Sequence, residues 1–413
     1  MKVPFMPFLI KMAWMNSFRN ARRTLLAGLA IGIGLAALIF TDGLMIGMSD
    51  SIVRIATDTF MGHGQVHAKG FRSTRDVARV VKGLPGVLER LRADPEVERF
   101  SLRVQTPGML ASPATSGTVL LYGVDPGLER PFSRVDEAIV EGSFLKRKDR
   151  RKILLGSKLA EALEIGLGDR VVVTAAEAES GELAQEMFRV GGIFHFDVRE
   201  LDGGVGFAHI EAVQRLLGLP GEVHEIAIHF KSFSGNEAAD AGFRSRFSRD
   251  GNEARSWREL MPQLSAVLDM SGFSSLIVGI ILFAVVSLGI VNTLFMSLHE
   301  RMFEYGVLRA VGTRPGRMAM MILFEVGTLS LFSILVGCCI GFVVTFLYSV
   351  QGIDYTGIEF AGVTLKEMIY PVLRLEQFVL FPMCVFLFTL VAGIYPAMYA
   401  ARLKPAQAMK AYE

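Results

Sequence analysis

The stretch His299–Met318, HERMFEYGVLRAVGTRPGRM, decides the fold because it separates two long apolar segments. It contains four arginines and two glutamates, so it interrupts the apolar run on either side. Gly312 provides a favourable helix end, with Pro315 behind it. The apolar residues recur at partial helical spacing, as Met302, Tyr305, Val307, Leu308 and Val311. The pattern predicts a short, charged, amphipathic helix between two membrane segments.

Four segments, including the two that flank this stretch, are apolar and long enough to cross a bilayer, which takes about 20 residues. They are Leu25–Met48, Phe273–Met296, Met318–Tyr348 and Phe378–Ala401. Buried helices of soluble proteins seldom run so far without a charge. We therefore interpret the 413-residue chain as an α-helical integral membrane protein with four transmembrane helices. We place these helices at 24–48, 273–297, 318–349 and 377–401.

The distribution of basic residues predicts the orientation of the chain. Residues 1–23 carry five Lys or Arg and no acid, and such flanks stay in the cytoplasm. We also expect them to form an amphipathic helix on the inner membrane surface. Four spans then return the charged helix, 298–317, and the tail, 402–413, to the cytoplasm. The loop 350–376 has four acids and two bases, which fits the outer face.

Residues 49–272 have a different character and predict one large mixed α+β domain outside the cytoplasmic membrane. Alternating apolar residues on both sides of Glu179–Gly181 predict a β-hairpin. We expect further strands near 62–71, 116–126 and 222–230, and helices near 80–98, 157–169 and 209–219. Two lobes are expected, and periodicity leaves their strand order open. Helical spacing in 48–61 and 257–272 predicts stalk helices that continue the first two spans.

No residue pattern in the chain predicts catalysis. The motifs G-x-x-x-x-G-K-[ST], H-E-x-x-H and G-x-S-x-G are absent, so nucleotide binding of the P-loop kind is not expected. The three cysteines lie inside predicted spans without metal-ligand spacing. Two acids, Asp42 and Glu325, lie towards the ends of spans, where we favour a structural role over a proton relay. We therefore expect no catalytic residue, no metal site, no cofactor bound by this chain and no nucleic-acid partner.

Pairs of glycines four residues apart lie in the predicted first and third spans. Small residues at this spacing allow two helices to approach closely in lipid. Such faces pack within one subunit or between two, and chance is the alternative because glycine is common in spans. The pairs are Gly28 and Gly32, Gly43 and Gly47, and Gly337 and Gly341.

Two interpretations of the charged helix follow from its pattern. An amphipathic helix can rest on the lipid surface. It can also seat in the groove of a cytoplasmic partner and transmit force through the two spans that it joins. Charge and periodicity fit both interpretations equally well.

The charged stretch also resembles a known family. It is similar to the pattern E-R-x-x-E-[IY]-G-x-[LM]-R-A-[LVI]-G-[AT] of FtsX-like permeases, the MacB and LolC/LolE superfamily of ABC transporters. The closing segment, YPAMYAARLKPAQAMK, matches that superfamily's closing pattern. In the outer domain, YGVDP, ILLGSKLAEALEIGLGDRVVV and FRVGGIFHFDVRELDGGVGFAHIEAVQRLLGL resemble the LolC/LolE-type lipoprotein-releasing permeases. The resemblance covers nearly the whole chain and implies a bacterial inner-membrane protein with a MacB-like periplasmic domain.

The resemblance implies partners and a mechanism. Two permease subunits, identical or different, would pair and bind two copies of a cytoplasmic ABC ATPase, which holds ATP and Mg. ATP-driven movement would pass through the stalks to the outer domains, a mechanism called mechanotransmission. It would expel a lipoprotein or related amphiphile from the membrane lipid to a periplasmic carrier. The ATPase-coupling residues would be Arg301, Glu304, Tyr305, Gly306, Leu308, Arg309 and Gly312, and the substrate cavity would be bordered by Phe40, Leu44, Met48, Leu264 and Leu268.

One departure from the family concerns the carrier. In LolC the corresponding hairpin bears a long hook that contains proline, whereas here AAEAESGELAQE is short, acidic and without proline. A LolC-like hook is therefore not expected. The resemblance leaves three functions: lipoprotein release, MacB-like export of drugs or peptides, and FtsX-like activation of a periplasmic hydrolase. The long outer domain, with its motifs similar to those of lipoprotein-releasing permeases, argues against the third.

Overall fold

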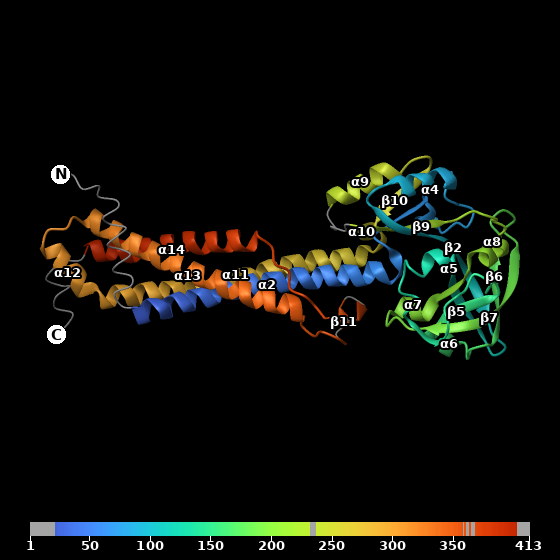
Figure 1. The fold of residues 1–413 in the computed structure, drawn as a ribbon, viewed down its shortest axis with the longest axis horizontal. Helices are drawn as coiled ribbons and strands as arrows, with labels where there is room; N and C mark the ends of the chain where they lie inside the picture. Colours follow the sequence, from blue (N-terminus) through green and yellow to red (C-terminus); the bar gives the residue numbers. More distant parts are fainter. Residues whose placement is uncertain (1–20, 232–236, 358, 361–362, 365–367, 403–413) are drawn as a thin grey trace. The chain divides into compact units, whose positions relative to one another are not determined.

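The structure is a computed structural model that describes residues 21–231, 237–357, 359–360, 363–364 and 368–402 (Figure 1). It divides into two compact units. The helical unit comprises Met1–Asp50, Asp269–Tyr355 and Glu367–Glu413, and the α+β unit comprises Ser51–Leu268 and Thr356–Lys366. The surface helix expected in 1–23 and the tail expected at 402–413 lie almost wholly outside the described residues.

In its described residues, the helical unit consists of four long apolar helices and one short charged helix. They are α2 (Ala21–Ala56), α11 (Pro262–Glu300), α12 (Met302–Ala310), α13 (Pro315–Gln351) and α14 (Gln377–Arg402). The four long helices have the length and composition needed to cross a membrane. Both α2 and α11 run beyond the predicted spans, because helical spacing continues into their polar ends.

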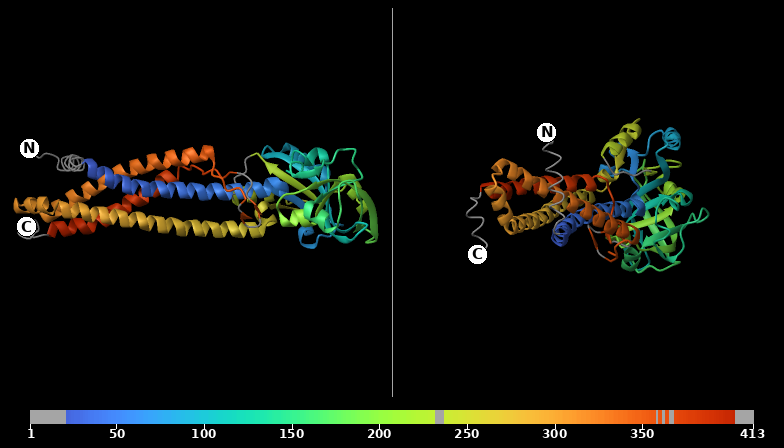
Figure 2. Two further views of the ribbon diagram at one scale, coloured as in Figure 1. Left: turned by 90° about the horizontal axis from the view of Figure 1, so that it is seen from below. Right: turned by 60° about the vertical axis from the view of Figure 1, so that its left-hand side comes forward.

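Side chains from all four long helices form the core of the helical unit. Leu35 of α2, Ile290 of α11, Met318 of α13 and Val385 of α14 are among its most buried members. Figure 2 shows α2 and α11 running alongside each other. Their contact is close at Gly34, where an added Cβ would lie 2.4 Å from a methyl group of Val286.

The α+β unit contains ten strands in one hydrogen-bonded network, in the order β10-β1-β9-β2-β3-β8-β5-β7-β4, with β6 pairing with β2 and β7. The pairs β3–β8 and β5–β7 are parallel, and the others are antiparallel. The strands are β1 (Gly64–Ala68), β2 (Val97–Ala111), β3 (Ser116–Val124), β4 (Ile139–Gly142), β5 (Lys152–Gly156), β6 (Arg170–Ala176), β7 (Leu183–Phe194), β8 (Val205–His209), β9 (Glu225–Phe230) and β10 (Asn252–Ser256). Two further strands, β11 (Glu359–Phe360) and β12 (Val363–Thr364), pair with each other.

The long strand β2 joins the two lobes that the sequence predicts. Its first half, 97–103, pairs with β9, and its second half, 103–111, pairs with β3. The lobes therefore share a strand instead of forming separate sheets. The predicted hairpin is confirmed, since β6 and β7 pair antiparallel and Gly181 has a φ of +69° in the turn.

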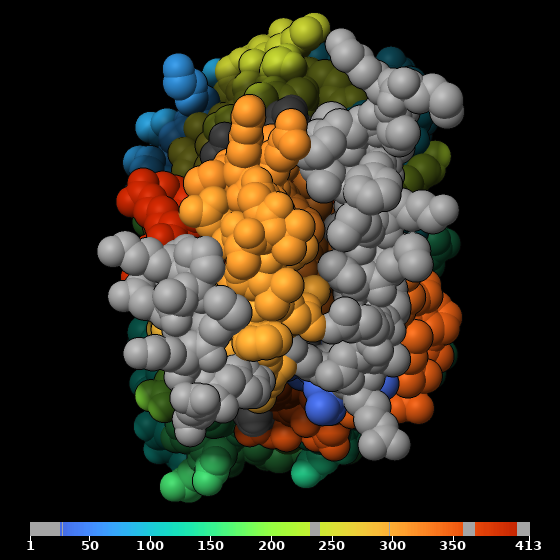
Figure 3. Space-filling model, turned by 90° about the vertical axis from the view of Figure 1, so that its left-hand side faces the viewer, coloured from blue at the N-terminus to red at the C-terminus, as the bar shows by residue number. Residues whose placement is uncertain are grey.

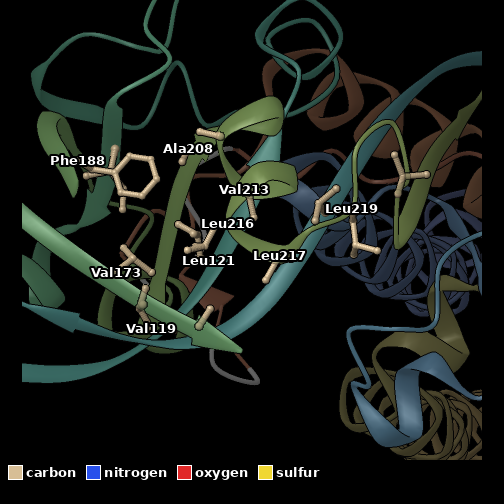
Figure 4. Packing of buried hydrophobic residues seen from close by; sticks show 14 of the residues in the cluster. Val119, Leu121, Val173, Phe188, Ala208, Val213, Leu216, Leu217 and Leu219 are labelled. Carbon is tan, nitrogen blue, oxygen red and sulfur yellow. The ribbon is translucent and has the colours of Figure 1, made fainter. Parts of the chain in front are cut away.

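Short helices cover the sheet. They are the π-helical turn η1 (Thr57–Met61), α3 (Phe71–Thr74), α4 (Leu84–Ala93), α5 (Pro126–Glu129), α6 (Ser157–Ala162), α7 (Arg199–Gly204), α8 (Ile210–Leu217), α9 (Glu237–Phe247) and α10 (Trp257–Leu260). Figure 4 shows how α8 packs, with Val213, Leu216 and Leu217 turned towards Leu121 and Phe188 of the strands. Because α8 carries apolar residues on one face, it buries that face and leaves its polar face in solvent.

The two ends of the α+β unit differ in how they join the long helices. At one end, α2 passes directly into η1 without a break. At the other end, Met261 has φ −125° and ψ 66°, so a non-helical residue separates α10 from α11. The single stalk helix predicted from Trp257 onward is thus two helices. The predicted fold class is confirmed: four long apolar helices, with a mixed α+β domain between the first and the second.

Candidate coupling site

The short helix α12 ends in a glycine turn. Gly312 has a φ of +96°, a value that glycine adopts without strain. Its N–H donates to Arg309 O and the N–H of Thr313 donates to Leu308 O, both at 3.1 Å. These are the two hydrogen bonds of a Schellman motif. The Nη1 of Arg309 also donates to Thr313 O at 2.9 Å, so the helix stops at a fixed residue.

One face of α12 is directed towards its own chain. Tyr305 and Gly306 are buried, and the Arg301 side chain is only 13% exposed. Arg301 forms an ion pair through Nη1 with Glu325 of α13, and its Nε donates to Glu304 at 3.1 Å. A charge that leaves water is tolerated when it is paired in this way. Arg301 therefore links the start of α12 to α13, while Tyr305 and Gly306 face the interior of the helical unit.

The opposite face of α12 is apolar and exposed. Phe303, Val307 and Val311 are 44%, 39% and 81% exposed, and they lie at i, i+4 and i+8, on one side of a helix. We call these three residues the α12 stripe. Figure 3 views this end of the helical unit, with the segment that contains α12 in orange. The apolar spacing in the sequence does not include Phe303, and it predicts Val307 and Val311 on the same face as Tyr305.

The two acids that the sequence singled out, Asp42 and Glu325, each have a partner within the helical unit. Asp42 of α2 accepts a hydrogen bond from the side-chain amide of Gln377 at the start of α14, at 2.8 Å. Glu325 of α13 pairs with Arg301. Both contacts connect segments far apart in the chain, as expected for structural acids.

Four of the predicted packing glycines lie where α2 meets α13. A Cβ added to Gly337 would lie 2.8 Å from Gly32 O, and one added to Gly32 would lie 3.1 Å from Gly337 N. Gly28 lies against the ring of Phe332, and Gly341 lies against Ile39. The backbones of α2 and α13 thus approach closely at these positions within one chain.

The other glycine pair has a different neighbour. A Cβ added to Gly43 would lie 2.8 Å from Val372 O, and one added to Gly47 would lie 2.1 Å from Tyr370 O. The N–H of Val372 donates to Gly43 O at 2.9 Å. These glycines of α2 therefore accommodate the extended segment before α14, whereas the sequence suggested a second helix.

Two family models match almost the whole chain. The MacB-like periplasmic core domain matches residues 24–245, more than half of the chain, and the FtsX-like permease C-terminal model matches residues 276–405. The chain is an FtsX-like permease with a MacB-like periplasmic core domain. It is thus a multi-pass ABC transporter permease, and the resemblance seen in the sequence is confirmed.

Individual relatives of the permease have low sequence identity to it but align along most of its length. The lipoprotein-releasing system transmembrane protein LolC of Xylella fastidiosa is 23% identical over 399 residues, which is 92% of either chain. The macrolide export ATP-binding/permease protein MacB of Chlorobaculum tepidum is 24% identical over 428 residues, covering 96% of this permease and 60% of that protein. The periplasmic region of MacB from Actinobacillus actinomycetemcomitans, a solved structure, is 12% identical with a TM-score of 0.33, covering 49% of this chain and 92% of that one.

The residues predicted to border a substrate cavity fall in both units of the permease. Phe40, Leu44 and Met48 belong to the helical unit, and Leu264 and Leu268 belong to the periplasmic unit. The ring of Phe40 lies 5.6 Å from that of Tyr348 in α13, so this side chain is partly covered within its own unit. Leu264 is buried.

One group of side chains in the periplasmic domain of the permease has the composition of a metal site. The ligand atoms of Asp58, His63 and His229 lie within 4.8 Å of one another. However, the N–H of Phe230 donates to His63 Nδ1 at 2.9 Å, which places the ring proton on Nε2, the atom that faces Asp58 at 3.8 Å. A metal ion needs the lone pair of that nitrogen. The guanidinium of Arg134, 3.9 Å from Asp58, also opposes a cation, so this group does not fit a metal.

Proposed function

We propose that the permease binds an ABC ATPase through the α12 stripe, and that the paired face of α12 carries the force into α13. The proposal is supported by the division of α12 into two faces. The outward face offers apolar side chains that are exposed in the permease alone, as anchors for a groove would be. The inward face is held by the ion pair of Arg301 and Glu325.

The proposed arrangement has the ATPase, α12 and both termini in the cytoplasm. Two ATPase copies act on a pair of permease subunits, either two copies of this chain or this chain with a sister permease. ATP and Mg belong to the ATPase. The basic residues of 1–23 and of the tail support this orientation.

For the cargo, we propose a lipoprotein or a related amphiphile that leaves the membrane for a periplasmic carrier. The support is a lipoprotein-releasing relative that aligns along 92% of either chain. The second candidate is MacB-like export of drugs or peptides, favoured by the macrolide-export relative. FtsX-like activation of a periplasmic hydrolase is a third and has less support, because the outer domain is long.

Val307→Glu tests the proposed ATPase contact. A carboxylate at the centre of an apolar contact would be buried without a partner, so we expect ATPase co-purification to fall at least about tenfold. Val140→Glu is the matched control, since Val140 is 60% exposed on β4 of the periplasmic domain. ATPase binding that is equal in the two variants would rule out the α12 stripe as the docking face.

A further inference from the structure

The carbonyl groups at the end of α2 and η1 are held by the periplasmic domain. The last carbonyls of a helix have no partner within the helix and must find donors elsewhere. Here three consecutive carbonyls each accept a hydrogen bond from a residue outside η1, and two of the three donors lie on distant segments of the domain. Thr59 O accepts from Arg134 N at 3.1 Å, Phe60 O from Arg103 Nη2 at 2.7 Å and Met61 O from Gln65 Nε2 at 2.8 Å.

Arg103, the donor to Phe60, is at the centre of a fully buried ionic group. Its guanidinium binds Glu129 of α5 through two hydrogen bonds, Nε to Oε2 at 2.9 Å and Nη2 to Oε1 at 2.7 Å. Its Nη1 donates to Glu225 of β9 at 2.8 Å. The guanidinium also lies 3.7 Å from the centre of the Phe60 ring. One side chain thus ties the end of η1 to β2, α5 and β9.

The rest of this group is also satisfied. Ser101 Oγ donates to Glu129 Oε2 at 2.6 Å, and Gln105 Nε2 donates to Glu225 Oε2 at 3.2 Å. A buried ionic group is a poor source of stability, because the loss of hydration offsets its attraction. It does fix one geometry, since every hydrogen bond has a required direction. The arrangement is therefore better suited to holding η1 in place than to stabilising the fold.

The connection to α11 is built differently. Here the non-helical residue Met261 separates α10 from Pro262, the first residue of α11. The last carbonyl of α10, on Leu260, accepts a hydrogen bond from the part-buried Arg72, at 3.1 Å. A non-helical residue between two helices is where backbone dihedral angles change most easily in a hinge.

We propose that Arg103 is a positioning residue that fixes η1 to the sheet, so that α2 moves the periplasmic domain as a rigid lever while α11 bends at Met261. The inference rests on the proposed function in one respect, namely that ATP-driven movement of the long helices reaches this domain. The rigidity of the joint itself is a property of the permease without nucleotide.

The test measures distances between spin labels in the full-length permease, with its three cysteines replaced. One label pair joins the exposed residues Arg54 on α2 and Lys158 on α6. The second joins Gln263, exposed near the start of α11, to Lys158. We expect one narrow Arg54–Lys158 distribution that ATP leaves unchanged in the assembled transporter, and a Gln263–Lys158 distribution that shifts with ATP.

The test variant is the neutral triple change Arg103→Met, Glu129→Gln, Glu225→Gln, which leaves no buried charge unpaired. We expect its Arg54–Lys158 distribution to broaden without nucleotide. In the assembled transporter, cargo release should fall about tenfold while the rate of ATP hydrolysis stays within about twofold of the parent's. The reason is that the variant loses the coupling between hydrolysis and release, not hydrolysis itself. Arg103→Lys, which keeps the charge but loses the fork that reaches Phe60, is the second variant if the triple change does not fold.

Arg130→Met is the matched control, since Arg130 pairs with Asp136 but is 68% exposed. It should leave both distributions and cargo release unchanged. A narrow Arg54–Lys158 distribution in the folded triple variant, or in Arg103→Lys, overturns the inference. So does a broad distribution in the parent. A parent permease that keeps the narrow distribution but recruits no ATPase would instead overturn the proposed function.

Discussion

At the residue scale, the partner of a charged side chain decides its role. The family resemblance implies that Arg301 is one of the residues that couple the permease to an ATPase. In the structure its guanidinium is 13% exposed and pairs with Glu325. Glu325 is 24 positions away along the chain, so a local pattern gives no sign of the pair. The sequence did place this acid near the end of a span with a structural role, which its pairing explains.

A double-mutant cycle measures this ion pair. We expect Arg301→Gln and Glu325→Gln each to weaken ATPase association, because each leaves a partly buried charge without its main partner. The double variant should bind the ATPase no more weakly than either single variant does, which corresponds to a coupling energy of about 1–3 kcal/mol. ATPase co-purification from detergent is the measurement. Arg314→Gln, at an exposed position before α13, is the control, and simple additivity would contradict the role of the pair.

Two buried histidines predict a loss of stability in acid. Burial, with a contribution from Arg99, lowers the pKa of His63 from 6.5 to about 4. Burial, followed by the charges of His63, Arg99 and Arg103, lowers the pKa of His229 to about 3. Both are neutral in the folded protein, whereas the unfolded chain binds protons below pH 6.5. Their contribution to the free energy of unfolding is therefore complete above pH 6.5 and declines as the pH falls towards 4. At pH 5 each histidine should lower the free energy of unfolding by roughly 2 kcal/mol.

Thermal unfolding of the full-length permease at pH 7.5 and pH 5 tests this pH dependence. His63→Asn keeps an acceptor for the N–H of Phe230 but does not titrate, so its midpoint should fall less on acidification. An equal fall in the parent and the variant would show that other groups cause the acid sensitivity.

At the scale of elements, composition and periodicity predict helices well and their neighbours poorly. The spacing of small residues predicts that another segment packs closely on α2, but it does not identify that segment. Gly32 meets α13, whereas Gly43 and Gly47 meet the extended segment that contains Val372 and Tyr370. The spacing of Gly28, Gly32, Gly43 and Gly47 is the same in both cases, so only the tertiary structure separates helix packing from a loop contact.

Gly337→Ala tests the contact between α2 and α13. The added Cβ would lie 2.8 Å from Gly32 O and 3.0 Å from the Cβ of Leu35, and a backbone carbonyl cannot move aside cheaply. We expect a loss of about 1–3 kcal/mol, seen as a lower unfolding midpoint in detergent. The matched control is Gly279→Ala in α11, where an added Cβ meets no atom of the described residues within 4 Å apart from its own helix neighbours. The better helix propensity of alanine should leave stability unchanged or raised there. Equal midpoints in the two variants would contradict the close approach.

At the scale of the whole molecule, the family identifies the chain as an ABC transporter permease, whereas its cargo is a proposal. The chain combines long apolar helices with a MacB-like domain between the first and the second. Relatives named for lipoprotein release and for macrolide export both align along more than nine tenths of this chain. Because their identities are nearly equal, at 23% and 24%, the choice between cargoes needs an experiment.

Depletion of the permease distinguishes the cargoes. If it releases lipoproteins, lipidated proteins should accumulate in the inner membrane, because nothing extracts them against the cost of exposing acyl chains to water. Quantitative mass spectrometry of separated membranes measures this. Complementation with Val307→Glu should not reverse the accumulation, whereas Val140→Glu should. Unchanged lipoprotein sorting together with new drug sensitivity would favour MacB-like export.

The sequence by itself determined the features that depend on residues close together along the chain. Apolar runs define the four long helices, alternation and a turn define the hairpin of β6 and β7, and Gly312 ends α12. The tertiary structure alone decided which face of α12 is exposed, which segment meets Gly43, and that Arg103 binds Glu225, 122 positions away. The physical reason is that helix and turn formation follow local periodicity and backbone preference, whereas burial and ion pairing depend on which distant segments pack together.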